Sequence, residues 1–210
     1  MSIAEKLVTI AENQEKVYEA GKADERETFW ENFQQGGSRK AYNNAFSYWW
    51  DACYNPIYPI VPNNAANMYS SSQIVDTKVP IDFTAITSSS NMNNVFAYST
   101  RLTTINKIIV NENTTYTNWF PYCRQLQNIT FVGTIGKSID FSECPLTPES
   151  MVNIILHLAQ YTGTEDAYKY TVKFNENCWS ALESSEYDVH THIAYGDTWR
   201  DGCVYLGWNT

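Results

Sequence analysis

The amino-acid sequence predicts an α+β fold: a leucine-rich-repeat solenoid of about four short coils, with an N-terminal helix before the coils and a C-terminal α/β cap after them. Three observations lead to this prediction. The middle of the chain repeats an apolar pattern, a capped amphipathic pattern opens the chain, and a clear helix start follows the last repeat. The chain then divides into an N-terminal helical segment (1–37), an aromatic- and Pro-rich connector (38–67), the leucine-rich-repeat coils (68–146) and the cap (147–210).

The N-terminal segment carries the pattern of an amphipathic helix. Ser2 and Glu5 form a capping box, in which each residue satisfies a backbone N–H group at the helix start. Apolar residues then follow a 4-3-4-3 spacing, which places them on one seam as in a coiled coil. The seam is only about two and a half heptads long, so a helix packed on its own domain is an equal alternative. The seam is the predicted contact of a homo-oligomer, with a trimer favoured, and consists of Ile3, Leu7, Ile10, Gln14 and Val17.

The repeat is clearest where residues 95–105 align with residues 119–129 at a shift of 24 residues. Phe, Tyr, a small Ser or Cys, Leu and Ile recur in both stretches; a shorter copy follows at 139–146, and a degenerate one begins at Met68. This period is typical of leucine-rich-repeat coils, each of which buries its apolar side against the next coil. We therefore expect these residues to point inward: Leu102, Ile105, Ile108, Leu126, Ile129 and Phe131. We also expect an internal ladder of small residues, formed by Ser99, Cys123 and Cys144.

The cap begins with a strong helix signal. The run Thr147-Pro148-Glu149 places a capping hydroxyl, a proline and an acidic residue where the first turn of a helix prefers them. Alternating apolar residues at 170–174 predict one strand, and short helices are expected at 178–182 and 199–206. The buried face of the first cap helix should consist of Met151, Ile154, Ile155 and Leu158.

Composition excludes several classes of partner. Of the 210 residues, 43% are hydrophobic and 18% are charged, and the net charge is −9. A chain this acidic binds the phosphate backbone poorly, so we expect no nucleic-acid partner. No apolar run approaches the roughly 20 residues of a membrane span, and no basic and apolar leader is visible, so we expect neither membrane insertion nor a signal peptide. Five cysteines without a CxxC pair favour free, buried thiols over a disulfide framework.

Polar residues between the inward-facing positions are the candidate ligand-binding residues. Outward positions of repeat coils carry recognition in solenoid proteins, and Asn, Thr and Tyr offer hydrogen bonds and flat rings that suit sugar or peptide ligands. The alternative is that these residues only keep the surface soluble. The candidates are Thr104, Asn106, Lys107, Asn128, Thr130, Tyr98 and Tyr122.

Two other patterns could carry chemistry. His190 and His192 lie among acidic residues and could bind a transition metal, but no third ligand stands at a defined spacing, so we expect solvated histidines and no metal site. A glycosidase needs two carboxyl groups across a cleft, and two acidic pairs could supply them: Asp140 with Glu143, and Glu165 with Asp166. Because GxSxG, HExxH and phosphate-loop motifs are missing from the sequence, we predict no catalytic residues and no cofactor.

Several stretches beside the repeats are similar to one known family: Lys16–Gly21, Phe29–Gly37, Gly133–Ser138, Cys144–Leu146, Thr198–Arg200 and Leu206–Asn209. With the repeats, they make nearly the whole chain resemble the BspA-type leucine-rich-repeat proteins, of the short kind found in phages and prophages of gut Firmicutes. The chain departs from that pattern in its short, irregular first coil near Met68–Asp82.

The resemblance implies a non-enzymatic recognition or structural protein of a phage or prophage particle, such as a tail-fibre or host-attachment component that binds a cell-surface ligand. The implied partners are further copies of the chain, other virion proteins, and a cell-surface glycan or protein. The implied location is the virion surface, after synthesis in the host cytoplasm. The alternatives are an adhesin-like repeat protein on the bacterial cell surface and, less favoured, a polysaccharide-cleaving spike enzyme.

Overall fold

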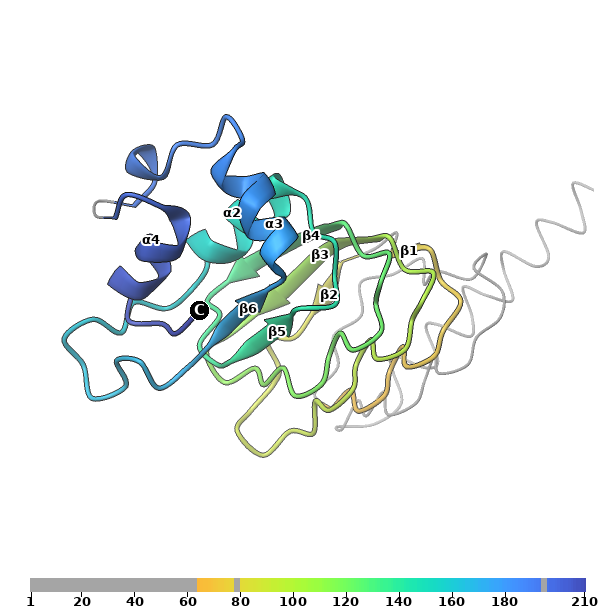
Figure 1. Ribbon diagram of the computed structural model, residues 1–210. Helices are drawn as coiled ribbons and strands as arrows, with labels where there is room; N and C mark the ends of the chain where they lie inside the picture. The colour runs from red at the N-terminus through yellow and green to blue at the C-terminus, as the bar shows by residue number, and fades with distance from the viewer. Residues whose placement is uncertain (1–63, 78–79, 194–195) are drawn as a thin grey trace, which may run out of the picture. The chain divides into compact units, whose positions relative to one another are not determined.

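The structure, a computed structural model, describes residues 64–77, 80–193 and 196–210. These residues belong to the compact unit that spans Arg39–Thr210. They form two parallel β-sheets and three α-helices (Figure 1). The N-terminal helical segment (1–37) and nearly all of the connector (38–67) lie outside the described residues. The predicted oligomerisation residues lie there too and stay a prediction: Ile3, Leu7, Ile10, Gln14 and Val17.

The first sheet is built around β3 (Thr104–Val110). β1 (Asp76–Thr77) and β2 (Ile81–Asp82) pair with one edge of β3, and β4 (Asn128–Gly133) pairs with the other edge. All three pairings are parallel. The apolar, β-branched sequence of β3 suits this central position, because such side chains pack well on a pleated surface.

A β-bulge interrupts the pairing of β3 with β4. Ile105 is aligned with Ile129 and Ile108 with Phe131, so two residues of β3, Asn106 and Lys107, stand opposite a single residue of β4. A bulge of this kind bends the strand and changes the direction in which its side chains point. Both of these β3 residues are exposed. The bulge therefore presents polar side chains on the outward face of the sheet.

The remaining elements follow in chain order as β5 (Ile139–Phe141), α2 (Pro148–Leu156), β6 (Val172–Phe174), α3 (Glu176–Glu183), a 3₁₀ turn η1 (Val189–Thr191) and α4 (Trp199–Tyr205). β5 and β6 pair in parallel and make the second sheet. α2 packs against β4 and α3, and α3 packs against α4, so that the three helices lie together (Figure 1). Thr147 caps α2 through its side chain, with Pro148 next, as predicted.

The predicted leucine-rich-repeat solenoid of about four short coils is wrong: the described residues form two separate parallel sheets, and no solenoid is present among them. β1 and β2 both pair with β3, whereas a solenoid would add one strand for each coil. β5, which opens the third repeat at 139–146, pairs with β6 and not with β4. The physical reason lies at the outer edge of β4, which α2 occupies in place of a further strand.

Two side chains of α2 close the edge of β4 by hydrogen bonding to its backbone. The Ser150 hydroxyl accepts the N–H group of Ile129 (3.0 Å), and the Asn153 side-chain oxygen accepts that of Phe131 (2.7 Å). The Asn153 amide group also donates to the Phe131 carbonyl (3.4 Å). Residues three apart share one face of a helix, so both side chains reach the strand together. The edge of β4 is thereby satisfied without strand pairing.

The apolar spacing correctly predicted which residues are buried. All six residues expected to point inward are at most 2% exposed: Leu102, Ile105, Ile108, Leu126, Ile129 and Phe131. The residues predicted to form the buried face of the first cap helix are buried as well, three in α2 and one two residues after its end: Met151, Ile154, Ile155 and Leu158. Burial of this apolar surface is the main favourable term in folding.

The 24-residue repeat appears in the core as a column of stacked rings, here called the aromatic column. It consists of Tyr69, Phe96, Phe120, Phe141 and Phe174, whose successive ring centroids are 5.3, 5.7, 4.7 and 5.7 Å apart. The planes of successive rings lie within 22° of parallel. Stacked aromatic pairs stabilise beyond the area that they bury, by about 0.5–1.5 kcal/mol each. The repeated Phe position is thus a core position.

The predicted ladder of small residues is also present. Ser99, Cys123 and Cys144 are fully buried. They donate in turn to the backbone carbonyl oxygens of Tyr69 (2.6 Å), Phe96 (3.1 Å) and Phe120 (3.9 Å). Burial raises the pKa of the Cys123 thiol to about 12 and raises that of Cys144 as well. These thiols are therefore protonated and unreactive in the folded protein.

Candidate functional site

A cavity of about 260 Å³ lies between the outward face of β3 and β4 and one side of α2. Four candidate ligand-binding residues line it, two from each strand: Thr104, Asn106, Asn128 and Thr130. Three residues of α2 complete the polar lining: Glu149, Ser150 and Asn153. Ile105 and Ile129 supply the remaining surface.

Strand register brings the four strand residues together. Thr104 stands directly opposite Asn128 in the parallel ladder, and the bulge sets Asn106 beside Thr130. The backbone N–H group of Asn106 donates to the Thr77 hydroxyl (3.0 Å), which ties the bulge to β1. Residues two apart on a strand point to the same face, so this polar face lies opposite the buried isoleucines. The site is therefore positioned by the sheet and not by a mobile loop.

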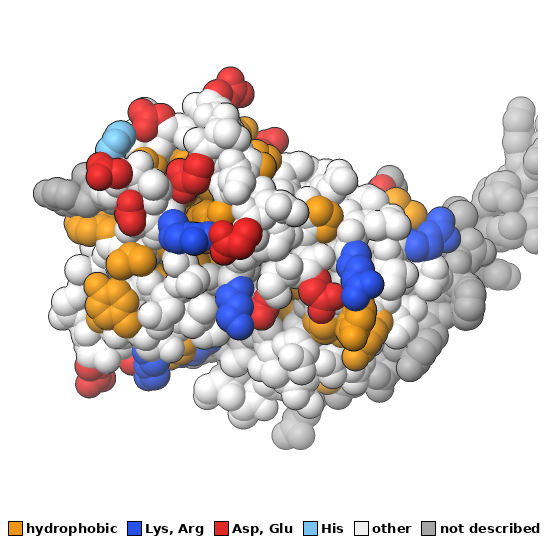
Figure 2. Space-filling model, in the orientation of Figure 1, with side chains coloured by type: hydrophobic (Ala, Val, Ile, Leu, Met, Phe, Trp, Pro, Cys, Tyr) orange, Lys and Arg blue, Asp and Glu red, His pale blue; other side chains and the backbone are white. Residues whose placement is uncertain are grey.

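Neutral groups dominate the chemistry of this cavity. Amide and hydroxyl side chains can each donate and accept hydrogen bonds, and Glu149 is the one charged residue among those that line it. Lys107, although predicted to bind ligand, is exposed and does not line the cavity. On the face shown in Figure 2, Lys and Arg side chains are spread over the surface, and several of them lie beside an acidic side chain. The surface therefore offers no basic patch on that face for an anionic ligand.

Tyr98 and Tyr122, the other two candidates, do not line this cavity. Their rings stack on each other with centroids 4.9 Å apart and planes 15° from parallel. The side chains are 52% and 41% exposed. The guanidinium of Arg124 lies over the Tyr122 ring, 4.9 Å from its centroid, and pairs with Glu143 at 3.4 Å. The seven candidates thus separate into a polar cavity, a tyrosine pair and the isolated Lys107.

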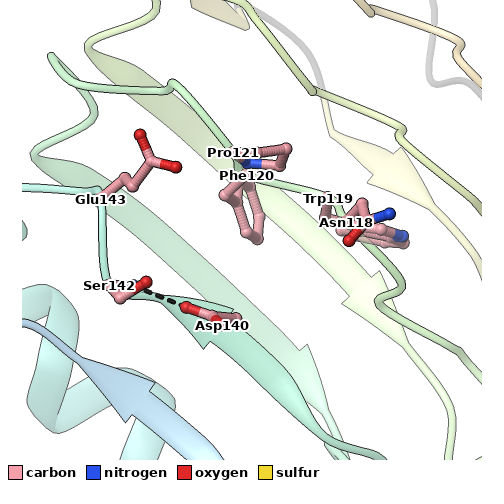
Figure 3. A pocket seen from close by; sticks show the side chains of 7 residues that line it. All are labelled: Asn118, Trp119, Phe120, Pro121, Asp140, Ser142 and Glu143. Atoms are coloured by element: carbon pink, nitrogen blue, oxygen red, sulfur yellow. Dashed lines mark hydrogen bonds between the residues drawn. The ribbon is translucent and has the colours of Figure 1, made fainter.

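The acidic pair Asp140 and Glu143 lines a smaller cavity of about 100 Å³ (Figure 3). Asp140 accepts the backbone N–H group of Ser142 (2.9 Å) and lies 3.6 Å from the ammonium of Lys173. The Glu143 carboxylate points away from Asp140 in Figure 3 and pairs with Arg124. These carboxylates therefore cap a turn and form exposed ion pairs. The other acidic pair is similar, since Asp166 pairs with Lys169 at 2.6 Å.

The two candidate metal-binding histidines make local structural contacts. Asp188 caps η1 by accepting the backbone N–H group of His190 (3.0 Å). The His192 Nδ1 atom lies 2.6 Å from the Thr191 hydroxyl, and its ring packs on Trp199 at 5.6 Å. In the part of the chain that the structure describes, no group of three or more His, Cys, Asp or Glu side chains could hold a metal ion.

Sequence reasoning missed the contribution of α2 to the cavity. Ser150 and Asn153 are polar residues in an amphipathic helix, a pattern that normally indicates a solvent-facing side. A signal was nevertheless present: Ser150 precedes the buried Met151 and stands three residues before Asn153, so both sit at the border of the apolar face.

None of the three α-helices that the structure describes is long and apolar enough to cross a membrane. No family model, curated protein or solved structure matches the chain. The resemblance to BspA-type proteins therefore stays a prediction.

Proposed function

We propose that this chain is a non-enzymatic recognition protein that binds a neutral, hydroxyl-rich ligand, such as a cell-surface glycan, in the cavity between β3, β4 and α2. One observation carries the proposal. Four outward-facing residues from two strands converge with three polar residues of a helix on one cavity of about 260 Å³. Small-molecule pockets typically measure about 300–1,000 Å³, so this one suits a single sugar residue of a longer chain.

The lining groups match the hydrogen-bonding pattern of a sugar. Each sugar hydroxyl donates and accepts, as do the Thr and Ser hydroxyls, and the Asn amides supply two donors and one carbonyl acceptor. Ser150 and Asn153 are already held by their bonds to β4, so binding would cost little further ordering of these two side chains. Since no Lys or Arg lines the cavity, a phosphate or sulfate group would find no counter-charge there.

The placement of this recognition protein on a phage or prophage particle, as a tail-fibre or host-attachment component, is supported by the sequence resemblance alone. An adhesin-like protein on the bacterial cell surface is the alternative. A virion component would expose the cavity to the host surface, where glycans are abundant ligands for weak, repeated contacts. Several copies of the chain would raise the overall affinity by multivalency.

The test is binding of the labelled full chain to a printed array of neutral oligosaccharides. Asn128→Ala and Thr130→Val each remove hydrogen-bonding groups from the cavity, and each should weaken binding about tenfold. Lys107→Ala is the matched control, because Lys107 lies on the same sheet face but does not line the cavity. Binding that is equal in all four proteins, or no binding by the unaltered chain, contradicts the proposal.

A further inference from the structure

Tyr98 and Tyr122 adopt a backbone conformation that is unfavourable for bulky side chains. Their φ angles are +62° and +61°, in the left-handed region. Four residues earlier in each turn, the left-handed positions hold Asn94 and Asn118, a residue type that tolerates this conformation. The corresponding position of the preceding turn holds the small residue Ser71, at φ +57°. Both turns therefore hold a tyrosine at a position where glycine or asparagine would fit with less strain.

Burial does not offset this strain. The two rings are 52% and 41% exposed, whereas the rings of the aromatic column are almost completely covered. The described contacts of the pair are mainly with each other and with Arg124. Strained residues that contribute little to the core tend to occur at ligand-binding positions.

The two rings of the pair have different neighbours. Tyr122 contacts two partners: Tyr98 of the preceding turn stacks on its ring, and Arg124, which pairs with Glu143 of the following turn, lies over it. The outer face of Tyr98 is directed toward the Ser71 position, whose N–H group donates to Ala97 (2.7 Å). A serine side chain is too short to cover a tyrosine ring. A ligand ring could therefore extend the stack beyond Tyr98.

We propose that the Tyr98–Tyr122 pair is a second binding site, separate from the polar cavity, that takes a pyranose ring of a neutral glycan on the face of Tyr98 that points away from Tyr122. The C–H face of a pyranose is apolar and flat enough to stack on an aromatic ring, and its hydroxyls lie at the rim. Arg124, the cation that the described residues place over the pair, is matched by Glu143, so the site favours neither an anion nor a cation. This site does not depend on ligand binding in the polar cavity.

The experiment uses the full chain and the same array of neutral oligosaccharides, extended with tyrosine- and tryptophan-containing peptides. Tyr98→Asn removes the ring and relieves the strain, whereas Tyr98→Phe keeps the ring. Tyr168→Asn is the matched control, since Tyr168 is also exposed (56%) and left-handed (φ +61°) but is not in the pair. Neither Asn variant should lower the midpoint of thermal unfolding, because Asn suits this conformation.

We expect Tyr98→Asn to weaken binding of at least one neutral glycan about tenfold, and Tyr98→Phe and Tyr168→Asn to change it less than threefold. Affinity that Tyr98→Asn leaves within twofold overturns the assignment. Loss of binding in Asn128→Ala together with unchanged binding in Tyr98→Asn also overturns it, while the cavity proposal stands. Preference of the Tyr98 site for the aromatic peptides, or no glycan binding at all, overturns it too.

Discussion

The hydrogen bonds between Asn153 and β4 allow a quantitative test of how the sheet edge is closed. The substitution Asn153→Ala removes the acceptor of the Phe131 N–H group (2.7 Å) and a weaker donor to the Phe131 carbonyl (3.4 Å). Phe131 is fully buried, so leaving its N–H group unpaired should cost about 1–3 kcal/mol. Alanine is the better helix former by up to about 0.7 kcal/mol, which offsets part of the loss. The free energy of unfolding should therefore fall by about 1–2 kcal/mol.

Urea unfolding followed by tryptophan fluorescence measures this change. Asn153→Asp is the control, because it keeps the acceptor of the 2.7 Å bond and should lose less stability than Asn153→Ala. Hydrogen exchange adds a local readout, since the Phe131 amide should exchange faster in Asn153→Ala. A variant as stable as the unaltered chain within about 0.3 kcal/mol, with unchanged exchange at Phe131, would refute the reasoning.

The buried thiols, one buried hydroxyl and the N-terminal seam give further predictions. Cys123 and Cys144 should resist alkylation until the protein is denatured, and rapid native labelling would contradict their burial. Burial raises the pKa of Cys123 from 9.0 to about 12, so the folded state holds the thiol proton more tightly than the unfolded state does. The free energy of unfolding should therefore fall as the pH rises from 9.0 toward 12. A free energy of unfolding that stays constant over this pH range in urea titrations would contradict this prediction. Tyr116→Phe should raise stability by about 1 kcal/mol, because its buried hydroxyl has no hydrogen-bond partner among the residues that the structure describes; the same burial raises its pKa. The nearby Thr114 side chain lowers that pKa, but the effect of burial is larger, and a clear loss of stability in calorimetry would contradict the prediction. Finally, light scattering should find the full chain oligomeric and Leu7→Asp monomeric; a monomeric full chain at high micromolar concentration would exclude the seam as a contact.

The sequence predicted which residues are buried better than it predicted which strands pair. The spacing of Leu102, Ile105 and Ile108 reports which side chains face inward, and the structure confirms their burial. The spacing does not predict what lies at the outer edge of β4, because two polar side chains of α2 occupy that edge in place of a strand. The solenoid prediction is wrong at this point, because the 24-residue repeat of apolar residues does not specify which strands pair.

The candidate site shows the same division. Thr104, Asn106, Asn128 and Thr130 were found because alternation along a strand separates buried from outward positions. The bulge that brings Asn106 beside Thr130 could not be predicted, since it depends on a register shift between two strands. The separation of the tyrosine pair from the cavity could not be predicted either, because the direction of the Tyr98 and Tyr122 side chains depends on the left-handed backbone conformation of these two residues.

The aromatic column affects how the described part of the chain unfolds. Tyr69, Phe96 and Phe120 come from turns beside the first sheet, whereas Phe141 and Phe174 lie in the strands of the second. The two sheets share no strand pairing among the described residues, so the rings join their interiors. If one sheet opened alone, it would expose ring surface of the other to water, at a cost of about 25 cal/mol per Å². Both sheets should therefore melt in one cooperative transition, with equal calorimetric and van't Hoff enthalpies.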